Sequence, residues 1–277
     1  MKADHGMAAP SMVLEGSGSR SYPAFPEFAP DQTFETSHYR VRFAGDRRDL
    51  EAVQRLRYGV FNIELREGLD GSHASERDED AFDSGCHHLM VVSKADDRVI
   101  GTYRMQTCDM ADAGRGFYCD TLFDLRDLPA DVRRRSVETG RACIAADHRN
   151  GRVLFLLWRG LAQYMKHNRM RYLFGCSSLT SQDPQEGLTV YDWLARQGHL
   201  HARIRLEPRP GHLCVIDGSI VCPNPPARVP QLMRLYLEYG AKVCGSPAMD
   251  RDFKTIDFFT LLDVEQFDPR LRQRFFG

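Results

Sequence analysis

The sequence of 277 residues has no apolar run of membrane-spanning length, no Cys-x-x-Cys motif and almost no net charge. A membrane helix needs about 20 consecutive apolar residues, so we expect any membrane association to be peripheral. The N-terminus lacks the apolar centre of a secretion signal, which favours a cytoplasmic protein with reduced cysteines. The formal net charge of −1 gives no argument for a nucleic-acid partner.

Cysteine and histidine are present, but their spacing does not support a metal site. The eight cysteines include no closely spaced pair of the zinc-ribbon or thioredoxin type. Several lie in apolar runs, where a free thiol acts as a small hydrophobic side chain. We therefore expect no bound metal.

The chain divides into three parts by composition. Residues 1–35 are rich in glycine, serine, proline and alanine and lack periodicity, which predicts a mobile arm. Docking of the aromatic segment 21–28 is the alternative. Residues 36–200 carry strand and helix patterns and are expected to form the core of the fold. Residues 201–277 are expected to form a C-terminal extension packed on that core.

Alternating and helical periodicities predict the elements of an α/β fold. A loop over residues 109–131 holds enough apolar side chains to form a packed lid. Helices are expected from Asp46 or Asp49 to about Gly68 and over 152–167, 185–197 and 232–239, and strands over 38–43, 88–92, 99–105, 137–144, 172–176 and 256–262.

Glu138 is the most informative residue, because it interrupts the strand-like run 137–144. An isolated buried carboxylate is costly, so we expect Glu138 to have a cationic partner or a function in catalysis. Arg141 could neutralise it, although a regular strand puts residues three apart on opposite faces. A bulge at Gly140 would bring both to one face. A structural ion pair and a general base for an attacking amine both remain open.

A turn before the helix 152–167 is a candidate phosphate site. Free backbone N–H groups at a helix start, a glycine and arginine side chains together favour an anion. A simple turn is the alternative. The turn residues are Arg149, Asn150, Gly151 and Arg152. Ser177 and Ser178, at the end of the following strand, are added as contacts for the same ligand.

Two acids lie in a charged loop before the hairpin, Asp80 and Asp83. From the residues alone a solvated loop is the simpler interpretation, and binding the cation of an amino-acid substrate is the alternative. Arg57 lies off the apolar stripe of its helix and could pair with these acids. Arg104 shares a strand face with Thr102 and Gln106, and these three could make a polar wall.

Several short motifs follow one another along the chain: Leu56-Arg57-Tyr58-x-Val60-Phe61, Asp80-x-x-Asp83, Gly101-Thr102-Tyr103-Arg104-Met105-Gln106, Val137-Glu138-x-Gly140-Arg141 and Leu157-Trp158-x-Gly160-Leu161. Their order and spacing resemble the acyl carrier protein-dependent N-acyltransferases of the GNAT superfamily. The resemblance is strongest to the L-ornithine N-alpha-acyltransferases of ornithine-lipid biosynthesis, often labelled hemolysin-like, and more distant to the acyl-homoserine-lactone synthases. It covers nearly everything after the arm.

The resemblance implies a mixed, mostly antiparallel sheet with splayed central parallel strands and helices on both faces. It implies transfer of a 3-hydroxyacyl chain from acyl carrier protein to the α-amine of an amino acid, with L-ornithine as the expected acceptor and lyso-ornithine lipid as product. Glu138 would be the base, with Arg141 beside it. The amino-substrate side would comprise Arg57, Asp80, Asp83 and Arg104.

Three alternatives belong to the same resemblance. A signal synthase would use S-adenosylmethionine, another N-acyl amino acid synthase would acylate glutamine, glycine, lysine or tyrosine, and a small-molecule acetyltransferase would use acetyl-CoA. No cofactor is expected beyond the 4'-phosphopantetheine that the donor carries. The chain lacks the N-terminal tryptophans of the signal synthases and has a longer C-terminal part, which disfavours the first alternative.

Two partners are expected from the same reaction. Acyl carrier protein is acidic, so it should dock on basic residues. The candidates are Arg133, Arg134, Arg135, Lys166 and Arg169. Because the product is amphiphilic, the basic and aromatic tail 271–276 is a candidate contact with the inner membrane surface, with packing on its own domain as the alternative.

Overall fold

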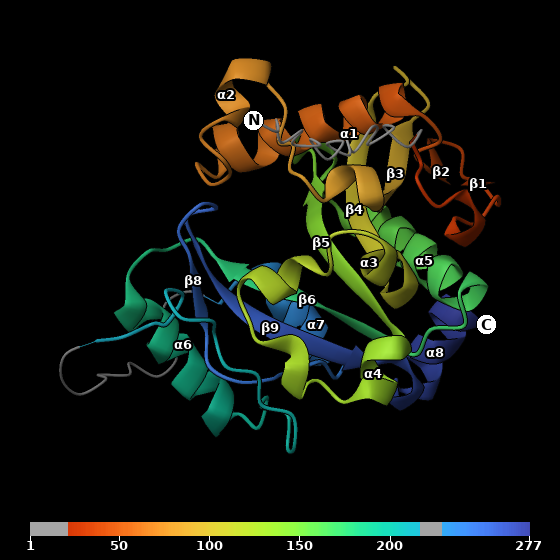
Figure 1. The fold of residues 1–277 in the computed structure, drawn as a ribbon. Coiled ribbons are helices and arrows are strands. Elements are labelled where there is room, and N and C mark those ends of the chain that lie inside the picture. Colours follow the sequence, from red (N-terminus) through yellow and green to blue (C-terminus); the bar gives the residue numbers. More distant parts are fainter. Residues whose placement is uncertain (1–21, 217–228) are drawn as a thin grey trace, which may run out of the picture.

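The computed structural model describes residues 22–216 and 229–277, which form an open sheet with helices on both faces (Figure 1). In this described part the nine strands run in the order β1-β2-β3-β4-β5-β6-β9-β7, and β8 pairs with β9. Their bounds are β1 Phe34–Glu35, β2 Tyr39–Phe43, β3 His87–Ser93, β4 Val99–Thr107, β5 Ser136–Ile144, β6 Tyr172–Leu179, β7 Lys242–Val243, β8 Ala248–Asp250 and β9 Thr255–Asp263. Every pairing is antiparallel except that of β5 with β6, which confirms the predicted sheet.

The longest helices of the first half of the sheet begin at a side-chain cap. Asp46 accepts the backbone N–H of Asp49 at the start of α1, and Asn150 accepts two backbone N–H groups at the start of α5. The helices are α1 Arg47–Tyr58, α2 Ser72–Ser75, α3 Cys108–Ala113, α4 Ala130–Arg134, α5 Gly151–His167, α6 Pro184–Arg196, α7 Gln231–Glu238 and α8 Pro269–Phe276. The predicted helix to about Gly68 was too long, because α1 gives way to a π-helical segment, Gly59–Glu64.

Alternation along the strands divides the apolar side chains between two faces. On one face, α5 and α8 pack over the first half of the sheet, and α6 and α7 over the second half. On the other face, α1 covers β3 and β4 through Val53. The lid, residues 108–134 with α3 and α4, covers β6 and β9 through Phe117 and Phe123. The loop was therefore predicted correctly as a packed lid.

The parallel pair β5–β6 is short and opens at one end. Only Ser136, Val137 and Glu138 pair with β6, opposite Tyr172, Leu173 and Phe174. Both strands continue beyond this point, β5 to Ile144 and β6 to Leu179. The predicted splay of the two central strands is thus present, and it begins directly after Glu138.

Residues at both ends of the chain join the sheet and its cover. Residues 22–35 pack against the rest of the protein, as in the alternative to a mobile arm. Phe25 is buried, and the Tyr22 hydroxyl lies 2.9 Å from His88 Nδ1. The rest of the predicted arm lies outside the described residues. The C-terminal part contributes β7, β8 and β9 to the sheet itself, and Phe275 of α8 is buried against Trp158 of α5.

Candidate active site

The split between β5 and β6 opens into a cleft of about 1180 Å³. Both strands line it beyond their last pair, and α5 and α7 close it on one face of the sheet. Glu138, Arg141, Arg104 and Gln106 line the cleft together with Tyr118 of the lid. The cleft thus joins a polar side under the lid to an apolar side under α5.

Glu138 is held by the lid. Its side chain accepts the backbone N–H of Tyr118 at 2.9 Å and that of Cys119 at 2.7 Å, and the residue is only 6% exposed. Burial raises the pKa of Glu138 above its ordinary value, although the two backbone bonds act in the opposite direction. A carboxylate with a raised pKa is a better proton acceptor near neutral pH.

Arg141 does not neutralise Glu138, so the alternative of a structural ion pair between them does not apply. The predicted bulge is present: the β4–β5 register shifts between Thr102 and Arg104, and Arg141 has a φ of 50°. The Arg141 guanidinium donates to Asp80 Oδ2 at 2.9 Å and lies 3.8 Å from the centre of the Phe253 ring. Arg141 therefore belongs to a neighbouring ionic cluster.

That cluster is buried, which corrects the interpretation of Asp80 and Asp83 as part of a solvated loop. Arg57 pairs with Asp83 as expected, its Nη1 donating to Oδ1 at 2.9 Å. Its Nε donates to Asp78 Oδ2 at 2.6 Å, and the side chains of Arg57 and Asp78 have no exposed surface. Arg104 Nη1 contacts both Asp80 and Asp83 at 2.7–2.9 Å.

The charges of the cluster balance one another. Burial alone would raise the pKa of Asp80, but the guanidinium groups of Arg104 and Arg141 lower that pKa to about 2. Burial opposes ionisation of Asp83 too, yet Arg57 holds the pKa of that carboxyl well below its usual range. Of these residues only Arg104 and Arg141 line the cleft. The sequence analysis did not select Asp78, because its role depends on a contact with a distant helix.

A second acid lines the cleft without a cation. Burial, together with the neighbouring carboxylate of Asp250, raises the pKa of Asp257 to about 7. Both acids are over nine-tenths buried, and in the described part of the chain neither forms a salt bridge. The Tyr118 hydroxyl donates to Asp250 Oδ2 at 2.6 Å. The sequence analysis selected neither residue, although Asp257 lies inside the predicted strand 256–262, where a carboxylate in an apolar run is the same signal that singled out Glu138.

The predicted phosphate turn lies at the wide end of the cleft. Arg149, Asn150 and Gly151 line it, whereas Arg152 is exposed outside the lining. Arg149 is paired with Glu64, Nη2 to Oε2 at 2.9 Å. The Asn150 side chain caps the first amides of α5, so a phosphate there would compete with two existing partners.

The strand opposite the turn brings the two predicted serines to the cleft. Ser177 and Ser178 both line it. Ser177 is buried and its Oγ accepts the hydroxyl of Thr260 at 2.9 Å, while Ser178 is exposed. Ser178 therefore has the more accessible hydroxyl of the two.

The face under α5 supplies an apolar wall. This part of the cleft is lined by Met105, Leu154, Leu157, Leu161, Leu173 and Leu262. Trp158, Tyr103 and Tyr236 also line it, and the two tyrosine hydroxyls lie 2.5 Å apart. An apolar wall of this size suits a hydrocarbon chain.

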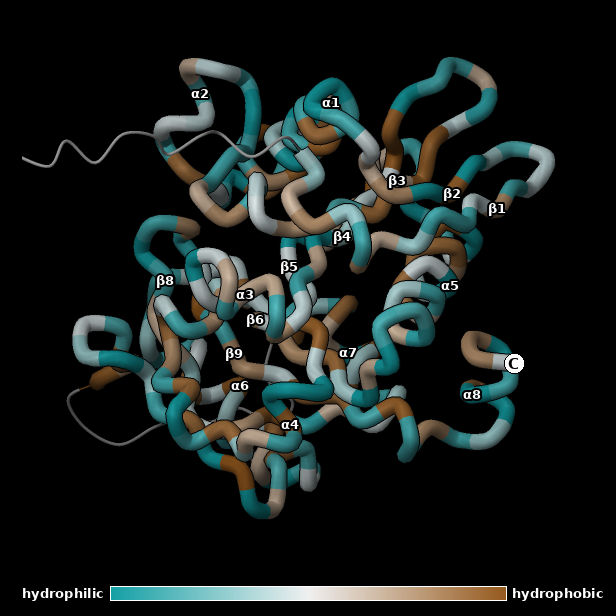
Figure 2. The backbone as a smooth tube through the Cα atoms, turned by 45° about the vertical axis from the view of Figure 1, so that its right-hand side comes forward, coloured by the Kyte–Doolittle hydropathy of each residue, from teal (hydrophilic) through white to brown (hydrophobic). Residues whose placement is uncertain are grey.

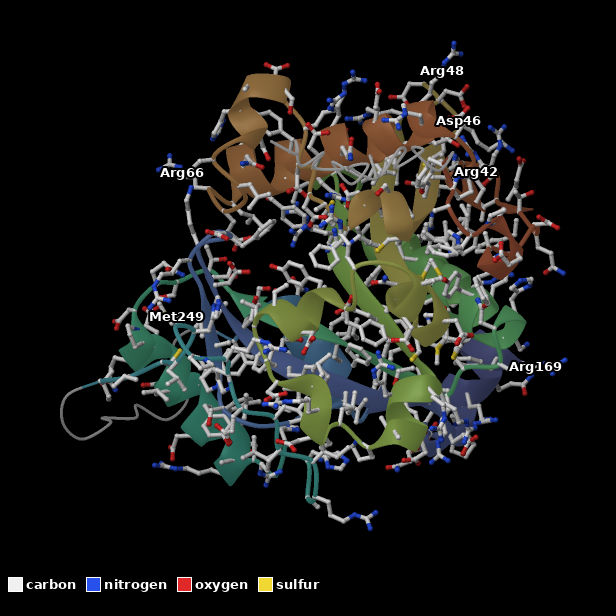
Figure 3. The ribbon with its side chains drawn as sticks, viewed as in Figure 1. Arg42, Asp46, Arg48, Arg66, Arg169 and Met249 are labelled. Atoms are coloured by element: carbon white, nitrogen blue, oxygen red, sulfur yellow. The ribbon has the colours of Figure 1, made fainter. Side chains whose placement is uncertain are left out.

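The basic residues predicted to dock a carrier protein gather at the narrow end of the split. Arg171 N–H donates to the Arg135 carbonyl, which brings the run at 133–135 next to the end of α5, where Arg169 projects (Figure 3). Arg133 is engaged with Asp112 of the lid and lies over the Phe117 ring. Arg134, Arg135, Lys166 and Arg169 are exposed. The 17 residues of α5 separate this patch from the turn at Gly151 by about 25 Å.

Within residues 22–216 and 229–277 no group of histidine, cysteine and acidic side chains is arranged to hold a metal ion. Over the same residues, no helix combines the length and apolar character that crossing a bilayer requires.

Comparison with known proteins defines the class. Residues 56–159 match the model of the acetyltransferase (GNAT) domain, so the chain is a GNAT-type acyltransferase. It is 32% identical over 249 residues to the L-ornithine N(alpha)-acyltransferase of Rhodobacter capsulatus, covering 85% of this chain and 93% of that protein. The protein of the same name from Brucella abortus is 29% identical, with 83% and 86% covered. The chain therefore belongs to the L-ornithine N(alpha)-acyltransferase family.

Among solved structures, the AHL synthase LasI is similar at 14% identity with a TM-score of 0.47, covering 87% of this chain and 96% of that one.

Proposed function

We propose that this chain transfers a 3-hydroxyacyl group from acyl carrier protein to the α-amine of L-ornithine, giving lyso-ornithine lipid. The observation that carries the proposal is the position of Glu138, buried in the split of the sheet where a polar and an apolar side of one cleft meet. Membership of the ornithine acyltransferase family supports the choice of acceptor.

The reaction follows from the two sides of the cleft. The thioester enters at the split with its acyl chain along the apolar wall, and the amine approaches from the side under the lid. The amine nitrogen attacks the thioester carbon, and Glu138 takes the proton that nitrogen loses. The C–N bond forms, the C–S bond breaks, and the proton passes from Glu138 to the pantetheine sulfur.

Beyond Glu138 the backbone of β5 no longer pairs with β6. An N–H of this stretch is the donor we propose for the oxyanion of the tetrahedral intermediate. Holding both reactants at the split supplies the remaining acceleration through orientation. We propose that Arg104 and Arg141 bind the acceptor carboxylate, since they are the cations of the buried cluster that line the cleft.

The test of the base is Glu138→Gln. We expect turnover to fall by ~10²–10⁴-fold, because the amide has no basic oxygen. Glutamine also leaves one of the two lid N–H groups without an acceptor, which costs about 1–3 kcal/mol. Leu125→Ala, a buried lid residue, is the matched control: it loosens the lid but keeps the carboxylate. Equal turnover losses in both variants would assign the effect to the lid and remove Glu138 from the chemistry.

The same assay separates the alternatives. The purified chain is incubated with 3-hydroxyacyl carrier protein and ornithine, and N-acyl products are measured by mass spectrometry. Lysine, glutamine, glycine, tyrosine or S-adenosylmethionine then replaces ornithine, and acetyl-CoA replaces the carrier. Product formed mainly from S-adenosylmethionine or from acetyl-CoA would refute the proposal and select the corresponding alternative.

We propose that the carrier docks at the wide end of the cleft, beside Arg149 and Arg152, because its phosphate must enter there. Arg152→Glu should raise the KM for the carrier, and the effect should shrink at high salt. Arg134→Glu, at the narrow end, is the matched control and tests the patch predicted from sequence. A larger salt-dependent effect from Arg134→Glu would move the docking surface to that patch.

A further inference from the structure

A buried side chain beside Glu138 carries an oxygen that no donor reaches in the described part of the chain. Gln106 lies on β4 directly opposite Glu138 of β5 and is 3% exposed. It lines the cleft, and no donor in the described part of the chain reaches its Oε1. The neighbouring polar groups differ, since Glu138 accepts two backbone N–H groups and Arg104 contacts two aspartates.

A buried amide oxygen without a donor needs an explanation, because nearly all such groups in folded proteins are hydrogen-bonded. Gln106 is not filling a core, where an apolar side chain of the same size would serve better. It sits at the point where the substrate amine meets the thioester in the proposed reaction. A ligand that donates a hydrogen bond there would satisfy it.

The attacking amine is such a donor. In its neutral form a primary amine has two N–H groups and one lone pair, and the lone pair must point at the thioester carbon. The two N–H groups then need two acceptors on the other side of the nitrogen. Side chains directly opposite each other on paired strands have Cβ atoms about 4.5–5.5 Å apart, so Glu138 and Gln106 together present two acceptors to one nitrogen.

We propose that Gln106 is the second acceptor for the attacking amine: its Oε1 holds the N–H that stays in the product while Glu138 takes the one that leaves. This inference rests on the proposed acyl transfer to an amine. Gln106 orients the lone pair of the amine nitrogen and takes no part in proton transfer. It therefore acts on the acceptor side of the reaction and leaves donor binding alone.

The test is Gln106→Leu, which keeps the volume and removes the acceptor. We expect kcat/KM for the acceptor to fall about 3- to 10-fold, the effect of losing one neutral hydrogen bond. The KM for the acyl donor should not change. The midpoint of urea unfolding should stay the same or rise, because a buried unpaired group is removed. Gln106→Met is the second variant if the leucine protein fails to fold.

Thr102→Val is the matched control. Thr102 is fully buried on the same face of β4 and its Oγ1 is likewise unpaired, but it does not line the cleft. We expect this variant to keep wild-type acceptor kinetics. The inference is overturned if Gln106→Leu keeps wild-type acceptor kinetics or if both variants lose equal activity. It is also overturned if Gln106→Leu has a lowered unfolding midpoint that accounts for its loss of activity. An inactive wild-type protein would instead refute the proposed function.

Discussion

The position of Arg57 leads to a prediction that separates folding from substrate binding. The family resemblance implies that it helps to bind the amino substrate, yet its side chain is fully buried and does not line the cleft. It donates to Asp78 Oδ2 at 2.6 Å, to the Asp78 carbonyl at 2.6 Å and to both oxygens of Asp83 at 2.9–3.0 Å. We therefore predict that Arg57→Leu acts on folding and leaves the affinity for the acceptor unchanged.

The magnitude follows from what the substitution leaves behind. Asp83 would retain Arg104, but Asp78 would keep only Arg141 Nε at 3.5 Å. Removing one partner of a buried ion pair costs about 3–5 kcal/mol, because the other charge stays desolvated. Domains have unfolding free energies of about 5–15 kcal/mol, so the loss is a large fraction. At about 2–4 °C per kcal/mol, Tm should fall by roughly 6–20 °C.

The assay pairs urea unfolding with acceptor kinetics at a temperature where the variant is still folded. Arg126→Leu is the control, because Arg126 pairs with Asp124 at the surface with 85% of its side chain exposed, and its unfolding midpoint should match the wild type. The predicted outcome for Arg57→Leu is a lower midpoint and an unchanged acceptor KM. A wild-type midpoint with a raised acceptor KM would show that Arg57 meets the substrate and that the structural account is wrong.

Two further predictions concern the split and Asp257. Gly175→Ala should lower the unfolding free energy by at least about 1–3 kcal/mol and reduce activity, because the new Cβ would lie 2.1 Å from the Thr139 carbonyl oxygen. The control is Gly140→Ala, whose Cβ meets nothing within 4 Å and which should be neutral; equal urea midpoints for the two variants would contradict this. The pKa of Asp257 is raised to about 7 from 3.8, so its contribution to stability is fully present below pH 4 and lost as pH rises through 7. Asp257→Asn should show a flatter pH dependence of the unfolding free energy over that window, and parallel profiles for the two proteins would refute the assignment.

Local patterns were sufficient for several of the longer elements and for Glu138. The long apolar run of α5 and the shorter apolar runs of β3 and β4 depend only on neighbours in sequence, so their boundaries were predicted to within about two residues. Glu138 stood out because a carboxylate in an apolar strand is costly wherever the strand lies. Reasoning about strand faces also suggested a bulge at Gly140, and the β4–β5 register shifts directly after that residue.

Partners from distant elements could not be predicted in this way. The segment that carries α2 is mainly hydrophilic (Figure 2), and Asp80 and Asp83 at its end were interpreted as exposed. Their burial depends on Arg57 from α1 and Arg104 from β4, which no local pattern reveals. The partners of Glu138 could not be predicted for the same reason. They are backbone N–H groups of the lid, and because every residue except proline has such a group, the sequence does not mark them.

The position of Glu138 ties the chemistry to the architecture of the sheet. It is the last β5 residue that pairs with β6, so the ladder on one side and the lid on the other fix its carboxylate. From Thr139 onward the same strand leaves β6, and its residues line the cleft. Placed two residues earlier, the acid would lie where the strands are closed; placed two later, it would lose the ladder that fixes it. The position of this carboxylate at the opening of the sheet, which the proposed role as base requires, therefore follows from where the parallel pair ends.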